Sequence, residues 1–339
     1  MPMQPTDLAG HLTEFLSVYL PCQKNASRNT IASYRDTFKL LLRYCQNSKG
    51  IPVEKLTMDM LSHGLVTNFL EWLESDRKSS ISSRNQRLAA IHSFFRYAQY
   101  EEPKGLANFQ KVIAVPQKKA PNPAVPHLTP EMMQILLAQP DRNTVKGRRD
   151  MTLMCTLYDS GCRVQELADL KVRDVITGST AVLVLTGKGG KTRRVPLMKN
   201  ALSLLQHYVQ EQSLDKPWKS DYPLFVNKQH NQLTKEGISY IISCYISPAR
   251  KVLPAVPEKV TPHMFRHSKA MHLLQAGVSL IYIRDFLGHE DIKTTEIYAK
   301  CDTELKRVAI ENAYPDLIDS TLPDWSRDAS LLEWLSSLK

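Results

Sequence analysis

Two histidines, an arginine and a tyrosine that suit phosphate chemistry lie between residues 261 and 298. Thr261 and Pro262 form a helix-start signal, a hydroxyl residue followed by proline at the first helical position. His263 and Arg266 then fall at positions i and i+3 on one helix face. Both side chains could therefore reach one ligand.

The other two side chains follow a second predicted helix. Its apolar stripe stops at Gly288, a residue type common just past helix ends, which leaves His289 directly beyond the helix. Asp291 is expected to start a short helix that carries Tyr298. Taken singly, each residue also fits an ordinary surface, loop or core role. Together, within one helical region, they are groups that suit phosphate chemistry.

A helix junction upstream adds a second arginine. Gly161 is expected to end an apolar helix, which places Arg163 in the first turn of the next helix and Glu166 one turn later. An arginine and a glutamate at this spacing are also typical of an ordinary surface ion pair, which stabilises a helix by a few tenths of a kcal/mol.

The order and spacing of these residues resemble the tyrosine recombinase (phage integrase) family, including Xer-type recombinases and mobile-element integrases. The family pattern Gly-x-Arg-x-x-Glu-Leu matches Gly161, Arg163, Glu166 and Leu167, and the pattern His-x-x-Arg, Leu-Gly-His and a tyrosine nine residues on matches His263, Arg266, Leu287, Gly288, His289 and Tyr298. Met264 and Phe265 depart from the leucine that more often precedes the second arginine, but they keep the position apolar.

The resemblance implies a site-specific DNA recombinase that cuts and rejoins DNA through a 3′-phosphotyrosine at Tyr298. Arg163 and Arg266 would bind the scissile phosphate with bidentate hydrogen bonds. Lys188 would protonate the leaving 5′-hydroxyl, and Glu166 would orient a histidine.

The two histidines of the motif also receive roles from the resemblance. His263 would assist proton transfer from the tyrosine, and His289 would donate a hydrogen bond to the phosphate. No metal or other cofactor is expected, because the site has no Asp/Glu cluster and the phosphotyrosine conserves bond energy for rejoining.

Lys188 stands in a turn between two predicted strands. Residues 172–175, 181–186 and 193–197 are β-branched or alternating, and glycine-containing turns separate them, which predicts a small antiparallel sheet. The turn sequence GKGGK lacks the Ser/Thr and following helix of a P-loop. Beyond Lys188, the expected phosphate contacts of this hairpin are Lys191, Arg193 and Arg194.

The N-terminal part is predicted to be an all-α unit of four helices. Apolar residues recur at helical spacing over residues 8–20, from Ser27 or Thr30 to residue 45, over 66–75 and over 83–100. This part resembles the SAM-like core-binding domain of integrases. The best DNA-contact candidates are Arg84, Asn85 and Arg87, although a solvated helix face fits each equally well.

A proline-rich connector, PQKKAPNPAVPH, separates two predicted domains. The expected organisation is a DNA-binding domain at 1–115, a linker at 116–128, a catalytic domain at 129–301 and a tail at 302–339. The fold class is mostly α with a small antiparallel β-sheet in the catalytic domain. The resemblance implies a two-domain clamp around DNA, in which Lys118 and Lys119 would lie near phosphates.

Charge supports a polyanionic partner for the body of the chain and not for its tail. The net charge is +10 and the isoelectric point about 9.2. Residues 1–128 hold 16 Lys and Arg against 10 Asp and Glu, residues 129–301 hold 24 against 16, and residues 302–339 hold 4 against 8. An apolar helical face in the tail, formed by Leu331, Trp334, Leu335 and Leu338, suits either packing on its own domain or docking on a neighbouring protomer.

The remaining sequence features favour a cytoplasmic protein without a membrane segment. No apolar run approaches the roughly 20 residues that span a bilayer, and no secretory signal is expected. The six cysteines form no Cys-x-x-Cys pair, which argues against a zinc ribbon and a disulfide framework. The resemblance implies double-stranded DNA with recombination half-sites as partner, and a homotetramer on synapsed DNA.

Three hypotheses follow from the sequence. The first is an active recombinase; the second is a non-cutting DNA-binding protein of the same fold; the third is a DNA-relaxing enzyme similar to type IB topoisomerases. Within the first, the long tail favours integration or transposition of a mobile element over chromosome or plasmid dimer resolution. The expected lack of an N-terminal arm-binding domain argues against a lambda-type integrase.

Overall fold

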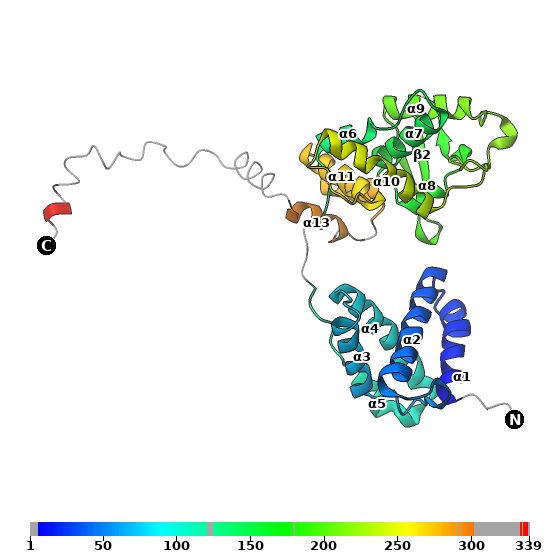
Figure 1. The fold of residues 1–339 in the computed structure, drawn as a ribbon, viewed down its shortest axis with the longest axis vertical. Helices are drawn as coiled ribbons and strands as arrows, with labels where there is room; N and C mark the ends of the chain where they lie inside the picture. Colours follow the sequence, from blue (N-terminus) through cyan, green and yellow to red (C-terminus); the bar gives the residue numbers. More distant parts are fainter. Residues whose placement is uncertain are drawn as a thin grey trace. The chain divides into compact units, whose positions relative to one another are not determined.

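The structure, a computed structural model, describes residues 6–120, 125–178, 180–289, 291, 293–301, 333 and 335–337. Contacts between Cα atoms divide the chain into two compact units, residues 1–123 and 124–339. The division falls within the proline-rich connector predicted at 116–128. Both units are mainly helical, and the second contains a three-stranded antiparallel sheet (Figure 1). None of the described helices is long and apolar enough to cross a membrane.

The described residues of the first unit form five α-helices. They are α1 (Asp7–Glu14), which continues as a π-helix over Phe15–Gln23, α2 (Arg28–Lys49), α3 (His63–Ser75), α4 (Ile81–Glu101) and α5 (Leu106–Ile113) (Figure 1). Serine side chains cap three of them: Ser27, Ser62 and Ser80 each accept a hydrogen bond from the backbone N–H three residues later. Four helices were predicted correctly, and α5 was not. Its buried stripe contains just Phe109 and Val112, too short to show a helical period.

Aromatic side chains form the centre of the first unit. The ring of Phe94 on α4 meets those of Phe15 and Phe38 in edge-on contacts, with centroid distances of 5.3 and 5.1 Å. Phe15, Phe38 and Phe94 are all buried, and they come from three different helices. The π-helix, α2 and α4 are therefore held together mainly by apolar packing.

The second unit combines helices with the sheet, whose strands β2 and β3 contact α8 and α12. Its helices are α6 (Pro130–Leu137), α7 (Val145–Ser160), α8 (Val164–Ala168), α9 (Lys199–Glu211), α10 (Lys235–Val252), α11 (Pro262–Gln275), α12 (Leu280–Leu287) and α13 (Lys293–Cys301), and its strands are β1 (Val175–Ile176), β2 (Val182–Thr186) and β3 (Thr192–Pro196). Gly161 and Gly288 end α7 and α12 in the left-handed conformation, as their positions predicted.

The sheet has the predicted antiparallel order β1-β2-β3. Its first strand is shorter than expected, because the carboxylate of Asp174 accepts a hydrogen bond from the N–H of Lys171 and folds residues 172–174 into a 3₁₀ turn. On β3, Arg193 and Val195 share the inward face and Arg194 lies on the outward face, as the period of two requires.

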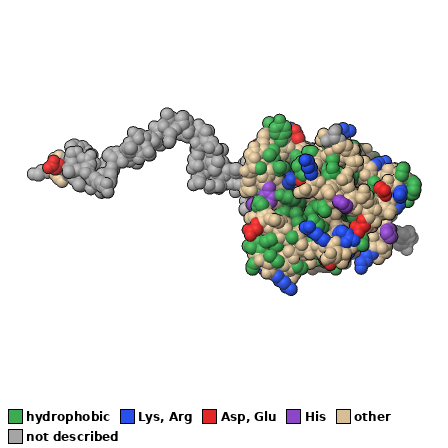
Figure 2. Space-filling view, turned by 90° about the horizontal axis from the view of Figure 1, so that it is seen from above, with side chains coloured by type: hydrophobic (Ala, Val, Ile, Leu, Met, Phe, Trp, Pro, Cys, Tyr) green, Lys and Arg blue, Asp and Glu red, His purple; other side chains and the backbone are tan. Residues whose placement is uncertain are grey.

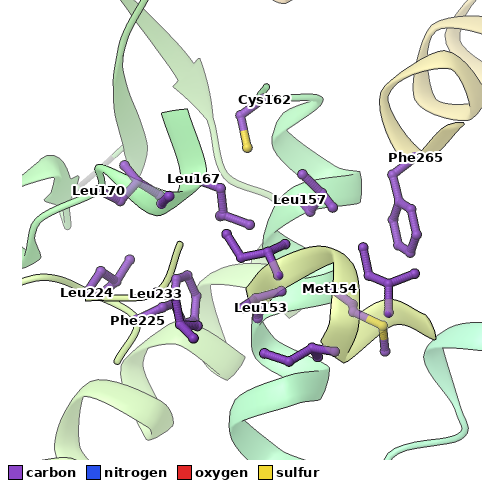
Figure 3. Packing of buried hydrophobic residues seen from close by; sticks show 14 of the residues in the cluster. Leu153, Met154, Leu157, Cys162, Leu167, Leu170, Leu224, Phe225, Leu233 and Phe265 are labelled. Carbon is purple, nitrogen blue, oxygen red and sulfur yellow. The ribbon is translucent and has the colours of Figure 1, made fainter. Parts of the chain in front are cut away.

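Helix α7 lies at the centre of the core of the second unit. Its residues Leu153, Met154 and Leu157 are buried and point toward apolar side chains from several other segments (Figure 3). These partners include Leu167, Leu170, Phe225, Leu233 and Phe265. The same core therefore fixes α8 and α11, which carry Glu166 and Arg266.

We expect the Phe94→Ala variant to lose about 3–5 kcal/mol of unfolding free energy, because the change leaves a cavity in the aromatic cluster. Urea denaturation followed by far-UV circular dichroism would measure it. Tyr100→Ala on the same helix is the matched control: this side chain is 84% exposed, and the expected change is within about 0.5 kcal/mol. Equal losses in both variants would contradict the proposed packing.

Candidate active site

Arg266 is buried on α11 and bridges the ends of two other helices. Its Nη1 donates to the carbonyl oxygen of Gly161 at 2.7 Å, and its Nη2 donates to that of Leu287 at 2.6 Å. Both carbonyls lie at helix C-termini, where the helix dipole favours a cation. Burial and the neighbouring Arg163 lower the pKa of Arg266 to about 10, so the guanidinium stays charged at neutral pH.

Arg163 is the N-cap residue of α8, and its side chain is 39% exposed. Its backbone N–H donates to Oε2 of Glu166 at 2.8 Å, and its Nη1 donates to Oε1 at 2.8 Å. Its Nη2 also donates to the carbonyl oxygen of Gly288 at 3.2 Å. Arg163 is therefore fixed by both α8 and the end of α12, while part of its guanidinium faces solvent.

Glu166 is buried between two arginines. Arg193 donates from Nη1 to Oε1 at 3.0 Å and from Nη2 to Oε2 at 2.8 Å, in addition to the bonds from Arg163. Burial acts to raise the pKa of Glu166, but the hydrogen bonds from Arg193 and Arg163 outweigh it and hold that pKa at about 2. The resemblance implied that Glu166 orients a histidine; in the structure it orients arginines.

Arg193 has a structural position that the sequence did not reveal. We predicted a phosphate contact, but its guanidinium pairs with Glu166 and its Nε donates to the carbonyl oxygen of Phe286 at 3.0 Å. The side chain is only 13% exposed. Gly288 is packed against it: a Cβ at Gly288 would lie 2.9 Å from Cδ of Arg193. The glycine of the Leu-Gly-His motif is therefore required by its left-handed backbone and by this close approach.

Tyr298 is buried on α13 and contacts a histidine that the sequence analysis did not single out. Its hydroxyl lies 2.8 Å from Nδ1 of His267 on α11. Burial raises the pKa of Tyr298, while the charge of Arg266 acts in the opposite direction. His267 follows Arg266 directly and stands four residues after His263, so helical periodicity could have identified it.

His289 is half-buried and lies beside the tyrosine ring. The two ring planes are 15° apart with centroids at 6.4 Å, and Nδ1 of His289 is 2.9 Å from Oγ1 of Thr295. Burial, together with the charges of Arg266 and Arg163, lowers the pKa of His289 to about 4. The imidazole is therefore neutral at pH 7.

His263 is exposed at the start of α11. Its ring centroid lies 6.4 Å from that of His267. The resemblance gave His263 a part in proton transfer from the tyrosine, but the histidine that contacts the tyrosine hydroxyl is His267.

A cleft of about 630 Å³ opens beside these groups. Its lining comes from the hairpin, α8 and the segment after α12: Arg163, Gly187, Lys191, Thr192, Arg193, Gly288, His289, Asp291 and Thr294. Lys188 stands in the hairpin turn, but its side chain lies outside the described residues. Arg194 is exposed on the outward face of β3. Among the described residues, no group of three or more His, Cys, Asp or Glu side chains is arranged to hold a metal ion.

In the first unit, three residues that we predicted to contact DNA hold the start of the connector. Nζ of Lys118 lies 2.8 Å from Oε1 of Glu74, and Nε of Arg84 lies 3.5 Å from the same atom. Arg84 also donates to the carbonyl oxygen of Pro116 at 3.2 Å. Asn85 donates to the carbonyl oxygen of Lys118 at 2.7 Å and accepts from its N–H at 3.1 Å. These contacts fix residues 116–118 on α3 and α4.

The other two candidates of this unit are more accessible. Arg87 is half-buried and donates to the carbonyl oxygen of Ser83 at 3.2 Å. It lines a polar groove between α2 and α4 together with Asn29, Ser33 and Gln86. Lys119 is exposed.

On the face shown in Figure 2, Lys and Arg side chains are spread out with Asp and Glu side chains between them, so basic charge is not gathered there in one patch.

We expect Glu166→Gln to destabilise the protein at neutral pH by on the order of 3 kcal/mol. The pKa of Glu166 is lowered from 4.5 to about 2 in the folded state. Its contribution is therefore fully present above about pH 4.5 and lost as the pH falls toward 2. The difference between variant and wild type should shrink over that window in urea denaturation. Glu236→Gln, at a side chain 72% exposed, should show no such difference; a pH-independent difference for Glu166→Gln would refute the ion-pair assignment.

Comparison with known protein families gives two matches along this chain. The model of the phage integrase family matches residues 126–304. The model of the phage integrase N-terminal SAM-like domain matches residues 12–102. The two matches together extend over both structural units.

Individual relatives agree with these matches. The chain is 37% identical to a putative integrase/recombinase of Sinorhizobium fredii over 98% of both chains. It is 32% identical to the tyrosine recombinase XerC of Bradyrhizobium diazoefficiens, over 91% of this chain and 94% of the relative.

Solved structures show the shared fold. XerH site-specific recombinase bound to its difH substrate superposes with a TM-score of 0.65 at 22% identity, over 86% of this chain and 81% of that chain. The Tn1549 transposon integrase in complex with transposon right end DNA gives a TM-score of 0.66 at 17% identity, over 88% and 98%. With sequence relatives and fold in agreement, the chain belongs to the phage integrase family of tyrosine recombinases, which are DNA strand-transferring enzymes.

Proposed function

We propose that this recombinase cuts and rejoins duplex DNA through a 3′-phosphotyrosine at Tyr298, and that it serves the integration, excision or transposition of a mobile element. One observation carries the proposal: Tyr298, His267, His289 and Arg266 come from three different segments and converge beside a cleft that Arg163 lines. The tyrosine hydroxyl has proton-transfer groups next to it, and the cleft supplies fixed cations for a phosphate.

The arginines would bind the scissile phosphate. Arg163 is partly exposed to the cleft, and the carbonyl contacts of Arg266 leave further N–H groups on its guanidinium. Because protein contacts already hold both side chains in place, little reorganisation is needed when a phosphate arrives. The two charges would stabilise the additional negative charge of the transition state.

Protonation of the leaving group and hydrogen bonding to the phosphate require further donors. Lys188, in the hairpin turn, would protonate the leaving 5′-oxygen, as the family resemblance implies. If Nδ1 of His289 accepts a hydrogen bond from the hydroxyl of Thr295, its Nε2 carries the proton and can donate to a phosphate oxygen. His289 can therefore donate this hydrogen bond to the phosphate in its neutral form.

The rest of the chain would bind and assemble on DNA. We propose that the N-terminal domain, residues 1–115, and the catalytic domain, residues 129–301, close around a half-site as a clamp, with Arg87, Lys119, Lys191 and Arg194 at phosphates. Four protomers would act on two synapsed sites in the cytoplasm. The relatives that support a mobile-element role include the putative integrase/recombinase of Sinorhizobium fredii; the Xer relatives keep dimer resolution as the alternative.

The proposal predicts a covalent protein–DNA adduct that requires Tyr298. Wild-type protein and the Tyr298→Phe variant would be incubated with duplexes from the flanks of the gene, nicked near candidate cleavage sites, and analysed by denaturing electrophoresis. An adduct is expected with wild type and not with Tyr298→Phe, while half-site binding is equal. Tight binding without an adduct in either protein, over several flanks, would favour a non-cutting DNA-binding protein.

The tail gives a second test, of assembly. The amphipathic face predicted at residues 331–338 lies mostly outside the described residues; Leu335 is described and is 47% exposed. If the tail docks on a neighbouring protomer, deletion of residues 320–339 should weaken assembly on paired sites more than binding to one half-site. Gel-shift titrations with one and two half-sites measure both, and equal losses would refute docking in trans.

A further inference from the structure

We propose that His267 holds the hydroxyl of Tyr298 and accepts its proton when the tyrosine attacks phosphorus. The inference rests on the proposed function, since it concerns the same nucleophile. It assigns a role to a histidine that is not among the catalytic residues implied by the resemblance, which are Arg163, Lys188, His263, Arg266, His289 and Tyr298. It also separates His267 from His263, which stands one turn earlier on the same helix.

The contact is short, partly buried and formed between two packed helices. Nδ1 of His267 lies 2.8 Å from Oη of Tyr298, and α11 and α13 are in direct contact. Tyr298 is 1% exposed and His267 is half-buried, so bulk water does not compete freely for the hydrogen bond. The tyrosine hydroxyl is therefore already aligned on the imidazole before DNA binds.

Both partners of this hydrogen bond are neutral at pH 7. Burial, His263 and Arg266 lower the pKa of His267 to about 4, with a smaller contribution from His127. The ring is therefore neutral at pH 7. Two arrangements of a neutral pair fit the distance: Nδ1–H donates to Oη, or Oη–H donates to Nδ1. The proposed proton transfer requires the second arrangement, in which Nδ1 is unprotonated and Nε2 carries the hydrogen.

A proton acceptor at this position meets a need of the reaction. Burial raises the pKa of Tyr298, which makes the phenol a weaker nucleophile at pH 7. As Oη forms its bond to phosphorus and the bond from phosphorus to the 5′-oxygen breaks, the phenolic proton would move to Nδ1 of His267. The leaving 5′-oxygen takes its proton from a separate donor, for which we proposed Lys188. In the rejoining step the 5′-hydroxyl attacks, and His267 returns the proton to Oη.

His289 is less suited to this step. Its Nδ1 is engaged with Thr295, and its ring plane lies nearly parallel to that of Tyr298. His263 is exposed, and its ring lies next to the ring of His267. His267 is thus the imidazole whose nitrogen meets the tyrosine hydroxyl.

The variant that separates holding from proton transfer is His267→Asn. The carboxamide oxygen of asparagine can take the place of Nδ1 and accept the hydrogen bond, but it is not a base at neutral pH. His272→Asn is the matched control: His272 lies on the same helix, and its Nδ1 is 2.8 Å from the hydroxyl of another tyrosine, Tyr158. A loss that follows from disturbing a partly buried histidine–tyrosine contact of α11 would appear in both variants.

The main measurement is the single-turnover rate of adduct formation on nicked duplexes from the flanks of the gene. We expect His267→Asn to bind half-site DNA like wild type and to form adduct about 100-fold more slowly, within the usual range for loss of a general base. His272→Asn should stay within a few-fold of wild type. Replacing Tyr298 by a fluorinated tyrosine of lower phenol pKa should restore at least about 10-fold of the loss in His267→Asn, because a more acidic phenol needs less help from a base.

Two outcomes would overturn the proposal: a wild-type rate in His267→Asn, or a slow rate that the fluorinated tyrosine does not improve.

A second experiment tests the contact between His267 and Tyr298 without DNA. In histidine-selective ¹⁵N spectra at neutral pH, His267 should show an unprotonated, hydrogen-bonded Nδ1 whose resonance shifts in Tyr298→Phe. If this signature is present but wild type forms no adduct on any flank, the proposed function fails and proton transfer fails with it, while the contact stands. If the signature is absent, the holding role is refuted even where adducts form.

Discussion

The site depends on the neutralisation of three arginines that lie close together in a partly buried position. Isolated buried cations are costly, so each needs a compensating group. Glu166 supplies one carboxylate to both Arg163 and Arg193, and the carbonyls at the ends of α7 and α12 receive Arg266. Removal of Glu166 would leave the arginines to repel one another. The helix ends, the hairpin and α11 are arranged around this group of charges.

The same positive charges determine the protonation states of their neighbours. They reinforce burial in lowering the pKa values of His267 and His289 to about 4, and they help to hold that of Glu166 at about 2. The site without DNA thus contains charged arginines, the carboxylate of Glu166, and neutral imidazoles at His267 and His289. A bound phosphate would bring negative charge next to these imidazoles and raise their pKa values. Substrate binding would therefore make His267 a better proton acceptor at the step that needs one.

The N-terminal unit shows that basic residues with similar sequence surroundings can have different roles. Arg84, Asn85 and Lys118 hold the start of the connector through Glu74 and through backbone carbonyls, while Arg87 lies in a polar groove three residues farther along α4. The first residues of the predicted linker, 116–118, are therefore held against the first unit.

Local patterns in the sequence determined most of the architecture. Helical apolar periods, serine and threonine caps, and the glycines at 161 and 288 depend on interactions within a few residues, so they could be read without the fold. The spacing of the motif likewise identified Arg163, Arg266, His289 and Tyr298, which the structure brings together. Helix α5 was not predicted, because its apolar stripe is too short to show a helical period.

Tertiary structure alone decided which of several similar side chains performs which task. Glu166 meets Arg193 across 27 residues and His267 meets Tyr298 across 31, contacts that no local period encodes. For Arg193 and Arg194, alternation along the strand separates two faces, but only packing shows which face is inside. A side chain acquires its partner and its pKa from groups distant in sequence, and those groups become neighbours only when the core closes.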